Sequence, residues 1–166
     1  MFKIFGSAFI IACCTYLGVN KIKEMNKRID GLYEFRAMLI QLRVEIEMKN
    51  TPLPYAIKNI GERFNNKCFK SCGEMILKIG GQAAFEKSLR ESANQYSFSE
   101  NEISAIGVLG QGLGRCDLIN QLRQIDYCIS RIDIALEEAK SELSKKNSIY
   151  VSGSVMFGAL IVLILL

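Results

Sequence analysis

The stretch LGQGLGRCD, Leu109 to Asp117, decides between two folds, because it places glycines at alternate positions before an arginine and an aspartate. A phosphate-binding P-loop requires G-x4-G-K-[ST] between a strand and a helix, and Gly107 and Gly112 have that separation. The next two residues, however, are Leu113 and Gly114 in place of lysine and Ser/Thr. A dinucleotide loop requires G-x-G-x-x-G after a strand, whereas this stretch is G-x-G-x-G in a helical pattern. We therefore interpret it as a joint between two helices.

The residues on both sides of this joint predict those helices. On the N-terminal side, Ser99 and Glu102 have the spacing of a capping box, which predicts a helix from Ser99 to about Leu113. On the C-terminal side, apolar residues recur at steps of three or four over 118–143. This stripe predicts a long helix that begins near Asp117 and continues into the C-terminal apolar segment.

A second long helix is predicted at the other end of the chain. Its apolar stripe runs over 22–46 without a break, so we expect one helix to reach about Lys49. Thr51 is suited to cap the following helix and Pro52 to its first position, where no N–H is needed. With Pro54, these residues form a turn that ends the first helix, because proline disfavours helical backbone before it.

Shorter amphipathic helices are expected between the two long ones. Apolar spacing predicts them over about 52–64, 68–79 and 85–96, the second with Ile79 as its last apolar residue and closed by Gly80 and Gly81. No alternating pattern of β-branched residues predicts a strand. The expected fold is all-α: an antiparallel helical bundle of about six helices, flanked by an N-terminal and a C-terminal transmembrane helix.

The two ends of the chain are strongly apolar. Residues 4–19 and 148–166 contain no charged side chain. As helices these runs would extend about 24 Å and about 27 Å, close to the thickness of a bilayer's hydrocarbon core. We therefore predict membrane spans at 1–20 and 148–166, with a helical domain at 21–147 between them.

Basic residues beside both runs predict the orientation. Such residues remain on the cytoplasmic side of a membrane, so the central domain is expected in the cytoplasm. One alternative stays open: Ile10 to Cys13 loosely fits a lipoprotein cleavage site, which would make the chain a tether with an extracytoplasmic helical domain. The basic flanks oppose that alternative and comprise Lys21, Lys23, Lys27, Arg28, Lys140, Lys145 and Lys146.

The composition disfavours catalysis. The chain has no histidine, which excludes Ser-His and Cys-His nucleophilic catalysis. Its six cysteines lack the paired spacing of structural zinc sites. The net charge of +4 comes from mixed signs, without the dense basic and aromatic surface that binds nucleic acid. We expect no enzyme activity, cofactor, metal, nucleic acid or small-molecule substrate.

Taken in order, these features resemble the stage III sporulation protein AB family of endospore-forming bacteria. The resemblance rests on the short N-terminal membrane helix, the Thr51-Pro52-Leu53-Pro54 turn and a Leu113-Gly114-x-x-Asp117-x-x-x-Gln121 element. A glycine-containing apolar tail from Ser152 completes it and extends the match over essentially the whole chain. One departure is Cys116, where the family usually has serine.

The resemblance implies a function. The family is similar to the inner-membrane platform proteins of type II secretion and type IV pilus machines, and belongs to the channel between mother cell and forespore. It implies a non-enzymatic scaffold on the mother-cell side of the outer forespore membrane. The implied partners are other membrane subunits of the channel and a cytoplasmic secretion-type ATPase.

Candidate contact residues lie at and just after the turn that precedes the last long helix. We predict partner contacts at Arg115, Asp117 and Gln121, because exposed turns that join helices are common contact surfaces. For Asp117, a helix cap is the alternative, and for Gln121 a buried or bridging amide. The residues predicted to set turn geometry are Thr51, Pro52, Pro54 and Gly114.

Overall fold

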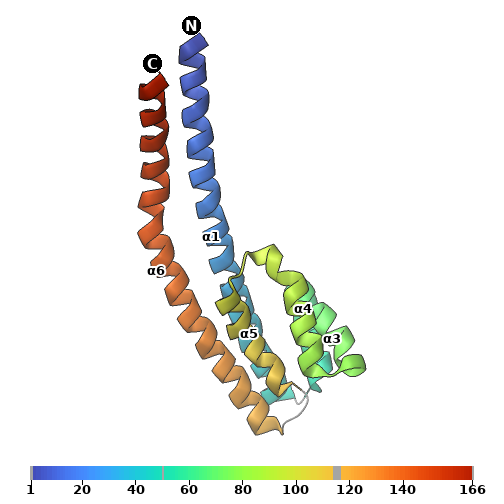
Figure 1. The fold of residues 1–166 in the computed structure, drawn as a ribbon. Coiled ribbons are helices and arrows are strands. Elements are labelled where there is room, and N and C mark those ends of the chain that lie inside the picture. Colours follow the sequence, from blue (N-terminus) through green and yellow to red (C-terminus); the bar gives the residue numbers. More distant parts are fainter. Residues whose placement is uncertain (1, 50, 114–116, 166) are drawn as a thin grey trace. The chain divides into compact units, whose positions relative to one another are not determined.

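The computed structural model describes the backbone of residues 2–49, 51–113 and 117–165, and the side chains of residues 13, 16–49, 51–113, 117–146 and 156. Over these residues the chain is all-α, which confirms the expected fold class (Figure 1). The described part contains six helices: α1 (Phe2–Lys49), α2 (Leu53–Arg63), α3 (Lys67–Ile79), α4 (Gly81–Tyr96), α5 (Glu100–Gly112) and α6 (Leu118–Leu165).

The chain forms two compact units, and α1 and α6 contribute to both. The first comprises Met1–Ile29 and Glu138–Leu166. In it, Arg28 Nη1 pairs with Glu142 Oε2 at 3.0 Å. The second unit, Asp30–Glu137, contains the four shorter helices and most of the described core.

The predicted membrane segments, 1–20 and 148–166, fall mostly on residues whose side chains lie outside the described part. Across the side chains that are described, no helix combines the length and the apolarity of a membrane span. The two spans therefore stay a prediction.

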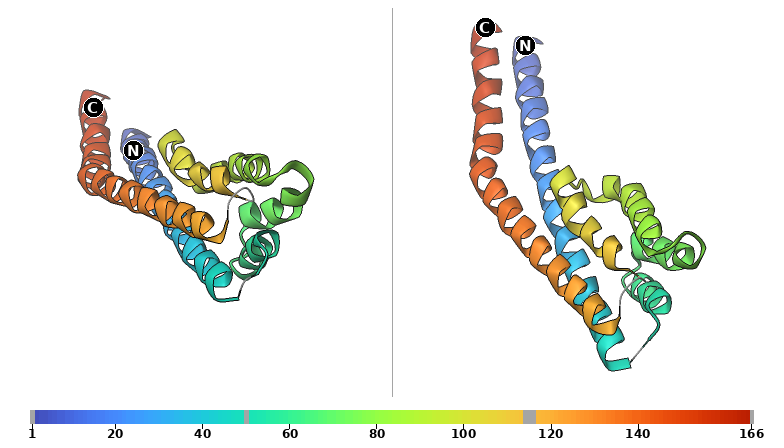
Figure 2. Two further views of the ribbon diagram at one scale, coloured as in Figure 1. Left: turned by 90° about the horizontal axis from the view of Figure 1, so that it is seen from below. Right: turned by 60° about the horizontal axis from the view of Figure 1, so that its bottom comes forward.

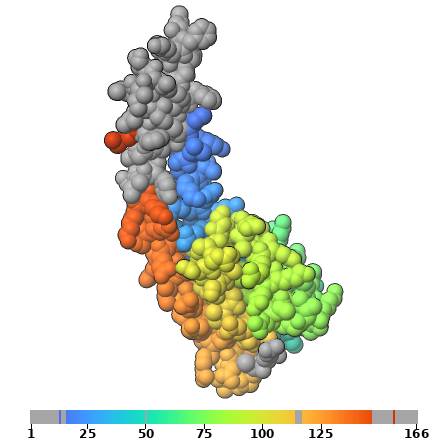
Figure 3. All heavy atoms as spheres, viewed as in Figure 1, coloured from blue at the N-terminus to red at the C-terminus, as the bar shows by residue number. Residues whose placement is uncertain are grey.

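In the Asp30–Glu137 unit, the short helices pack in sequence order: α2 on α3, α3 on α4, and α4 on α5 (Figure 2). Figure 3 shows the side of this unit on which α4, α5 and α6 reach the surface. Aromatic rings join the short helices to α1. The Phe35 ring meets Phe69, Tyr96 and Phe98 edge-on, with centroids 5.6–5.8 Å apart. Such edge-to-face contacts add to the stabilisation from burial.

A buried polar cluster lies beside these rings. Asn66, only 1% exposed, caps α3 by accepting the Phe69 N–H at 3.1 Å through Oδ1. Its Nδ2 donates to Glu34 Oε1 at 2.8 Å and to the Tyr96 hydroxyl oxygen at 2.9 Å. The Tyr96 hydroxyl donates to the same Glu34 oxygen at 3.1 Å. Burial raises the pKa of Tyr96, so its phenol remains protonated as a donor.

The turns show how the helices begin. Ser99 is the N-cap of α5, and its backbone N–H donates to Glu102 Oε2 at 2.8 Å, as in a capping box. Helix α2 begins one residue later than expected: Pro52 is its N-cap, with φ −54° and ψ 134°, and Leu53 is its first residue. Thr51 does not cap this helix, because its hydroxyl bonds to Glu45 at the end of α1.

Candidate functional site

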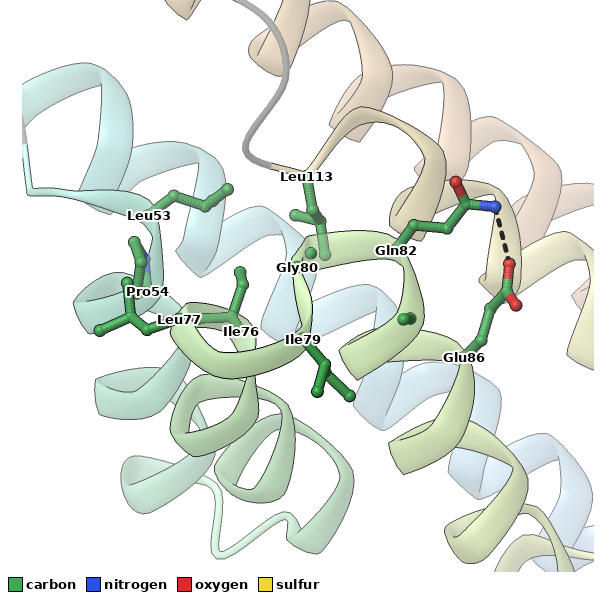
Figure 4. A pocket seen from close by; sticks show the side chains of 11 residues that line it. Leu53, Pro54, Ile76, Leu77, Ile79, Gly80, Gln82, Glu86 and Leu113 are labelled. Carbon is green, nitrogen blue, oxygen red and sulfur yellow. Dashed lines mark hydrogen bonds between the residues drawn. The ribbon is translucent and has the colours of Figure 1, made fainter.

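The second unit has an apolar groove where several helices begin or end. The start of α2, the end of α3, the start of α4 and the residue after α5 enclose about 690 Å³ (Figure 4). We call this the α2–α4 groove. Its lining residues are Leu53, Pro54, Ile76, Leu77, Ile79, Gly80, Gly81, Gln82, Ala83, Glu86 and Leu113.

Two glycines make the corner between α3 and α4 at this groove. Gly80 has φ +85°, in the region that only glycine adopts freely. It ends α3 by donating its N–H to the Ile76 carbonyl at 3.1 Å, and its own carbonyl accepts the Ala84 N–H at 3.0 Å. At Gly81, an added Cβ would lie 2.2 Å from the Leu113 carbonyl oxygen. The pair therefore lets α4 begin directly after α3 and in contact with the backbone that follows α5.

The rim of the groove exposes large apolar side chains. Leu77 is 74% exposed and Ile79 48% exposed, and Tyr55, next to Pro54, is 60% exposed. Ile79 belongs to the apolar spacing that predicts this helix, yet its side chain is not part of the core. The α3 stripe is buried as far as Ile76, and the last turn of the helix continues beyond the core. Apolar side chains gathered on a surface are typical of a binding site.

Polar groups are few along the same groove. Gln82 Nε2 donates to Glu86 Oε1 at 3.0 Å, one turn later on α4 (Figure 4). Glu86 is the one charged residue in the described lining. The groove is therefore suited to an apolar protein segment with a few polar contacts rather than to an anionic metabolite.

The structure brings the two predicted turn elements together. Leu53 and Leu113 line the α2–α4 groove and also a small second cavity between α5, α6 and the α2 start. Gln121 lines that second cavity, at intermediate exposure, whereas Pro54 lines the groove. The contact between the elements was not predicted, because nothing in either local sequence indicates a partner far along the chain.

Of the predicted contact residues, Asp117 is the one that the structure places at a helix start. It is exposed and immediately precedes α6, and its carbonyl accepts the Gln121 N–H at 3.0 Å. Its carboxylate accepts from Asn120 Nδ2 at 2.5 Å. These bonds give Asp117 a local structural role, and its partner contact stays a prediction. Gly114 and Arg115 lie outside the described residues.

A buried carboxylate supports the turn before α2. Glu45 is 5% exposed, and Lys49 Nζ lies 2.8 Å and Arg63 Nη2 3.6 Å from its Oε1. The bond from Lys49, helped by Arg63 and the Thr51 hydroxyl, holds the pKa of Glu45 below its ordinary value, against the opposing effect of burial. Glu45 thus ties the end of α1 to both ends of α2 through side chains that the sequence stripe did not single out.

Three of the four described thiols are unsuited to nucleophilic chemistry. Cys68, Cys72 and Cys128 are fully buried. Burial raises the pKa of Cys72 and of Cys128 to about 12 and raises that of Cys68 further, so all three remain protonated. Among the described side chains, no three His, Cys, Asp or Glu residues gather as a metal site requires.

Comparison with known proteins gives concordant matches. A sequence model of the family Stage III sporulation protein AB (spore_III_AB) matches residues 3–166. The Stage III sporulation protein AB of Bacillus subtilis (strain 168) is 25% identical over 171 residues, covering 100% of both chains. A solved structure of Stage III sporulation protein AB (SpoIIIAB) has a TM-score of 0.64 at 22% identity, covering 71% of this chain and 97% of that chain. This last likeness shows a common fold.

The glycine corner gives a first prediction. Gly81→Ala is expected to lower the free energy of unfolding by about 1–3 kcal/mol, because the new methyl group meets backbone that cannot rotate away. Gly107→Ala is the matched control. Within α5 its Cβ would meet only Leu89 Cδ2, at 3.9 Å. Alanine there is expected to raise the free energy of unfolding by about 0.5–1 kcal/mol. Urea unfolding of the full chain in detergent, followed by circular dichroism, measures both; equal effects would contradict the described corner.

Glu45 gives a second prediction, on pH. Its folded pKa is lowered from 4.5, so its stabilising effect is complete above that pH and is lost as the pH falls through the lower folded value. In Glu45→Gln, unfolding free energies measured from pH 6 downward are expected to fall less steeply than in the parent chain. Lys49→Gln leaves the carboxylate in place, so it is expected to make the fall of unfolding free energy with pH only partly less steep. If the unfolding free energy of both variants depends on pH as steeply as that of the parent chain, the ion pair of Glu45 with Lys49 does not stabilise the fold.

Proposed function

The chain belongs to the stage III sporulation protein AB family, and we propose that it is a non-enzymatic scaffold subunit of the channel between mother cell and forespore. In this proposal it docks a cytoplasmic secretion-type ATPase to the other membrane subunits. The resemblance to secretion and pilus platform proteins supports the ATPase as partner. The family match over residues 3–166 supports a role in the same sporulation machinery.

The α2–α4 groove is the observation that carries the docking proposal. It is formed by helix ends, where side chains such as Leu77 extend past the core and are exposed to solvent. A partner segment that covers Leu77, Ile79 and Tyr55 would bury apolar area now facing water, and such central apolar contacts dominate the energetics of interfaces. We propose that Asp117 and Gln121, together with Arg115, contribute polar contacts beside it.

We further propose two membrane spans, at 1–20 and 148–166, with the domain at 21–147 in the mother-cell cytoplasm. The support is the absence of charge from residues 4–19 and 148–166, together with the basic residues that flank them on the inner side. This arrangement places the groove in the compartment where an ATPase has its nucleotide. An extracytoplasmic tether is the alternative, and the orientation test below distinguishes the two.

Docking is tested by co-purification of the sporulation ATPase with the full chain from sporulating cells. Leu77→Glu places a charge at the most exposed apolar position of the groove rim and is expected to reduce the bound ATPase at least tenfold. Ile134→Glu is the control: it makes the same kind of change at an exposed position on α6, 53% exposed, and is expected to retain the ATPase.

The same assay tests the predicted polar contacts. Reversing both charges with Arg115→Glu and Asp117→Lys is expected to weaken ATPase binding if these side chains contact it. Full retention in that variant would remove the turn from the interface. Full retention in Leu77→Glu would remove the groove.

Orientation is tested with an introduced thiol. Asn94 is exposed on α4, so Asn94→Cys is accessible, whereas the native Cys68 is buried and does not report on the compartment. An impermeant maleimide is expected to add no label to Asn94→Cys, relative to the parent chain, in intact cells and to label it after permeabilisation. Added label in intact cells would establish the extracytoplasmic alternative.

A further inference from the structure

Helix α1 has a second apolar stripe outside the core. Tyr33, Ile40, Val44 and Met48 are exposed by 38–77%, although most of the neighbouring apolar residues of this helix are buried. Their separations of seven, four and four residues put them along one side of the helix. Stripes with this spacing are typical of helices that pack against another helix. Within one chain these four side chains are only partly covered.

Helix α6 has a corresponding exposed side. Ile119, Tyr127 and Ile134 are 52–65% exposed. They lie opposite the buried side of the helix, which comprises Ile125, Cys128, Ile132, Ala135 and Leu136. Tyr127 and Ile134 are seven residues apart, the same separation as Tyr33 and Ile40 on α1.

Two ion pairs connect α1 and α6 beside these stripes. Arg36 Nε lies 2.6 Å from Asp133 Oδ1, and Arg43 Nε lies 2.9 Å from Asp126 Oδ1. Because the α6 number falls as the α1 number rises, the helices run antiparallel. In both pairs α1 supplies the arginine and α6 the aspartate, and the side chains are 38–52% exposed. Tyr33 lies close to Arg36, which connects the stripe with the charges.

We propose that this surface, the α1/α6 face, binds the same face of a second copy of the chain. The face is defined by Tyr33, Arg36, Ile40, Arg43 and Val44 on α1 with Asp126, Tyr127, Asp133 and Ile134 on α6. The arginines of α1 pair with the aspartates of α6 within the chain, and Glu47 also pairs with Arg43. A surface that carries both signs in this order, as a basic column and an acidic column, can be complementary to itself, which is the requirement for a two-fold interface. A partner of one predominant charge would leave one column opposed by like charge.

The charges also select how two copies meet. If α1 lay on α1 of the second copy, arginines would face arginines and aspartates would face aspartates. If α1 lies on α6 of the second copy, each arginine faces an aspartate at the same level, and the apolar stripes on both helices are covered. This second arrangement keeps the two copies pointing in the same direction, as copies embedded in one membrane must. Complementary charges of this kind fix orientation more than affinity.

The experiment uses a charge swap on the full chain in detergent micelles. One variant carries Arg36→Glu and Arg43→Glu, and the other carries Asp126→Arg and Asp133→Arg. Each has like charges in both columns, so each alone is expected to have the mass of one copy. The parent chain is expected to have twice that mass. An equimolar mixture of the two variants is expected to recover the doubled mass, since opposite charges then meet between chains.

The mixture separates self-association from misfolding, because an unfolded variant cannot be rescued by its counterpart. Mass is measured by light scattering after chromatography, with detergent subtracted, and the helical signal of each variant is compared with that of the parent. Leu77→Glu is the control and is expected to keep the doubled mass. A parent chain that remains single over a hundredfold concentration range overturns the proposal. The proposal is also overturned if either variant alone has the doubled mass, or if the two variants are folded but keep the mass of one copy when they are mixed.

This inference stands apart from the docking of an ATPase. The α2–α4 groove is lined by other helices, so Leu77→Glu is expected to lose the ATPase and keep the doubled mass. The charge variants are expected to show the reverse. Failure of either result leaves the other proposal standing.

Discussion

The contact between α1 and the start of α3 is the interaction on which the second unit depends. Asn66 does three things there with one side chain: it caps α3, bonds to Glu34 on α1, and bonds to the Tyr96 hydroxyl at the end of α4. A buried amide left without partners would cost free energy, so these bonds specify one position of α3 and α4 against α1. The rings around Phe35 then fill the space beside them. The helix ends that form the α2–α4 groove follow from that placement.

The groove is a consequence of where helices stop. Helix α3 ends at Ile79 with Gly80 as its C-cap, and Gly81 starts α4 against the Leu113 carbonyl, so neither residue of this corner places a side chain there. The last turn of α3 meanwhile extends beyond the core and leaves Leu77 in solvent. A surface formed in this way is made of backbone corners and apolar side chains, with little charge. Its chemistry is that of a protein contact.

The sequence predicted the helices well because their signals are local. The unbroken stripes of α1 and α6, the Ser99 and Glu102 spacing and the glycine joint all act within a few residues. What it did not predict depends on distant partners. Asn66 is a local cap signal that the apolar spacing did not use. Its bonds to Glu34 and Tyr96, and the contact of Gly81 with Leu113, join separate helices. Ile79 continues the periodicity of α3 but falls outside the core, because periodicity does not show where a neighbouring helix ends.

Helices α1 and α6 are the elements that the two units share. Each helix runs from one unit into the other without a described interruption, α1 from Phe2 to Lys49 and α6 from Leu118 to Leu165. Within the second unit, Asn66 joins the start of α3 to Glu34 on α1, and Glu45 joins the end of α1 to Arg63 on α2. Cys72 and Cys128 lie buried in this packing with raised pKa values, so their thiols remain protonated. For the docking role proposed above, these contacts matter because they fix the helix ends that line the α2–α4 groove.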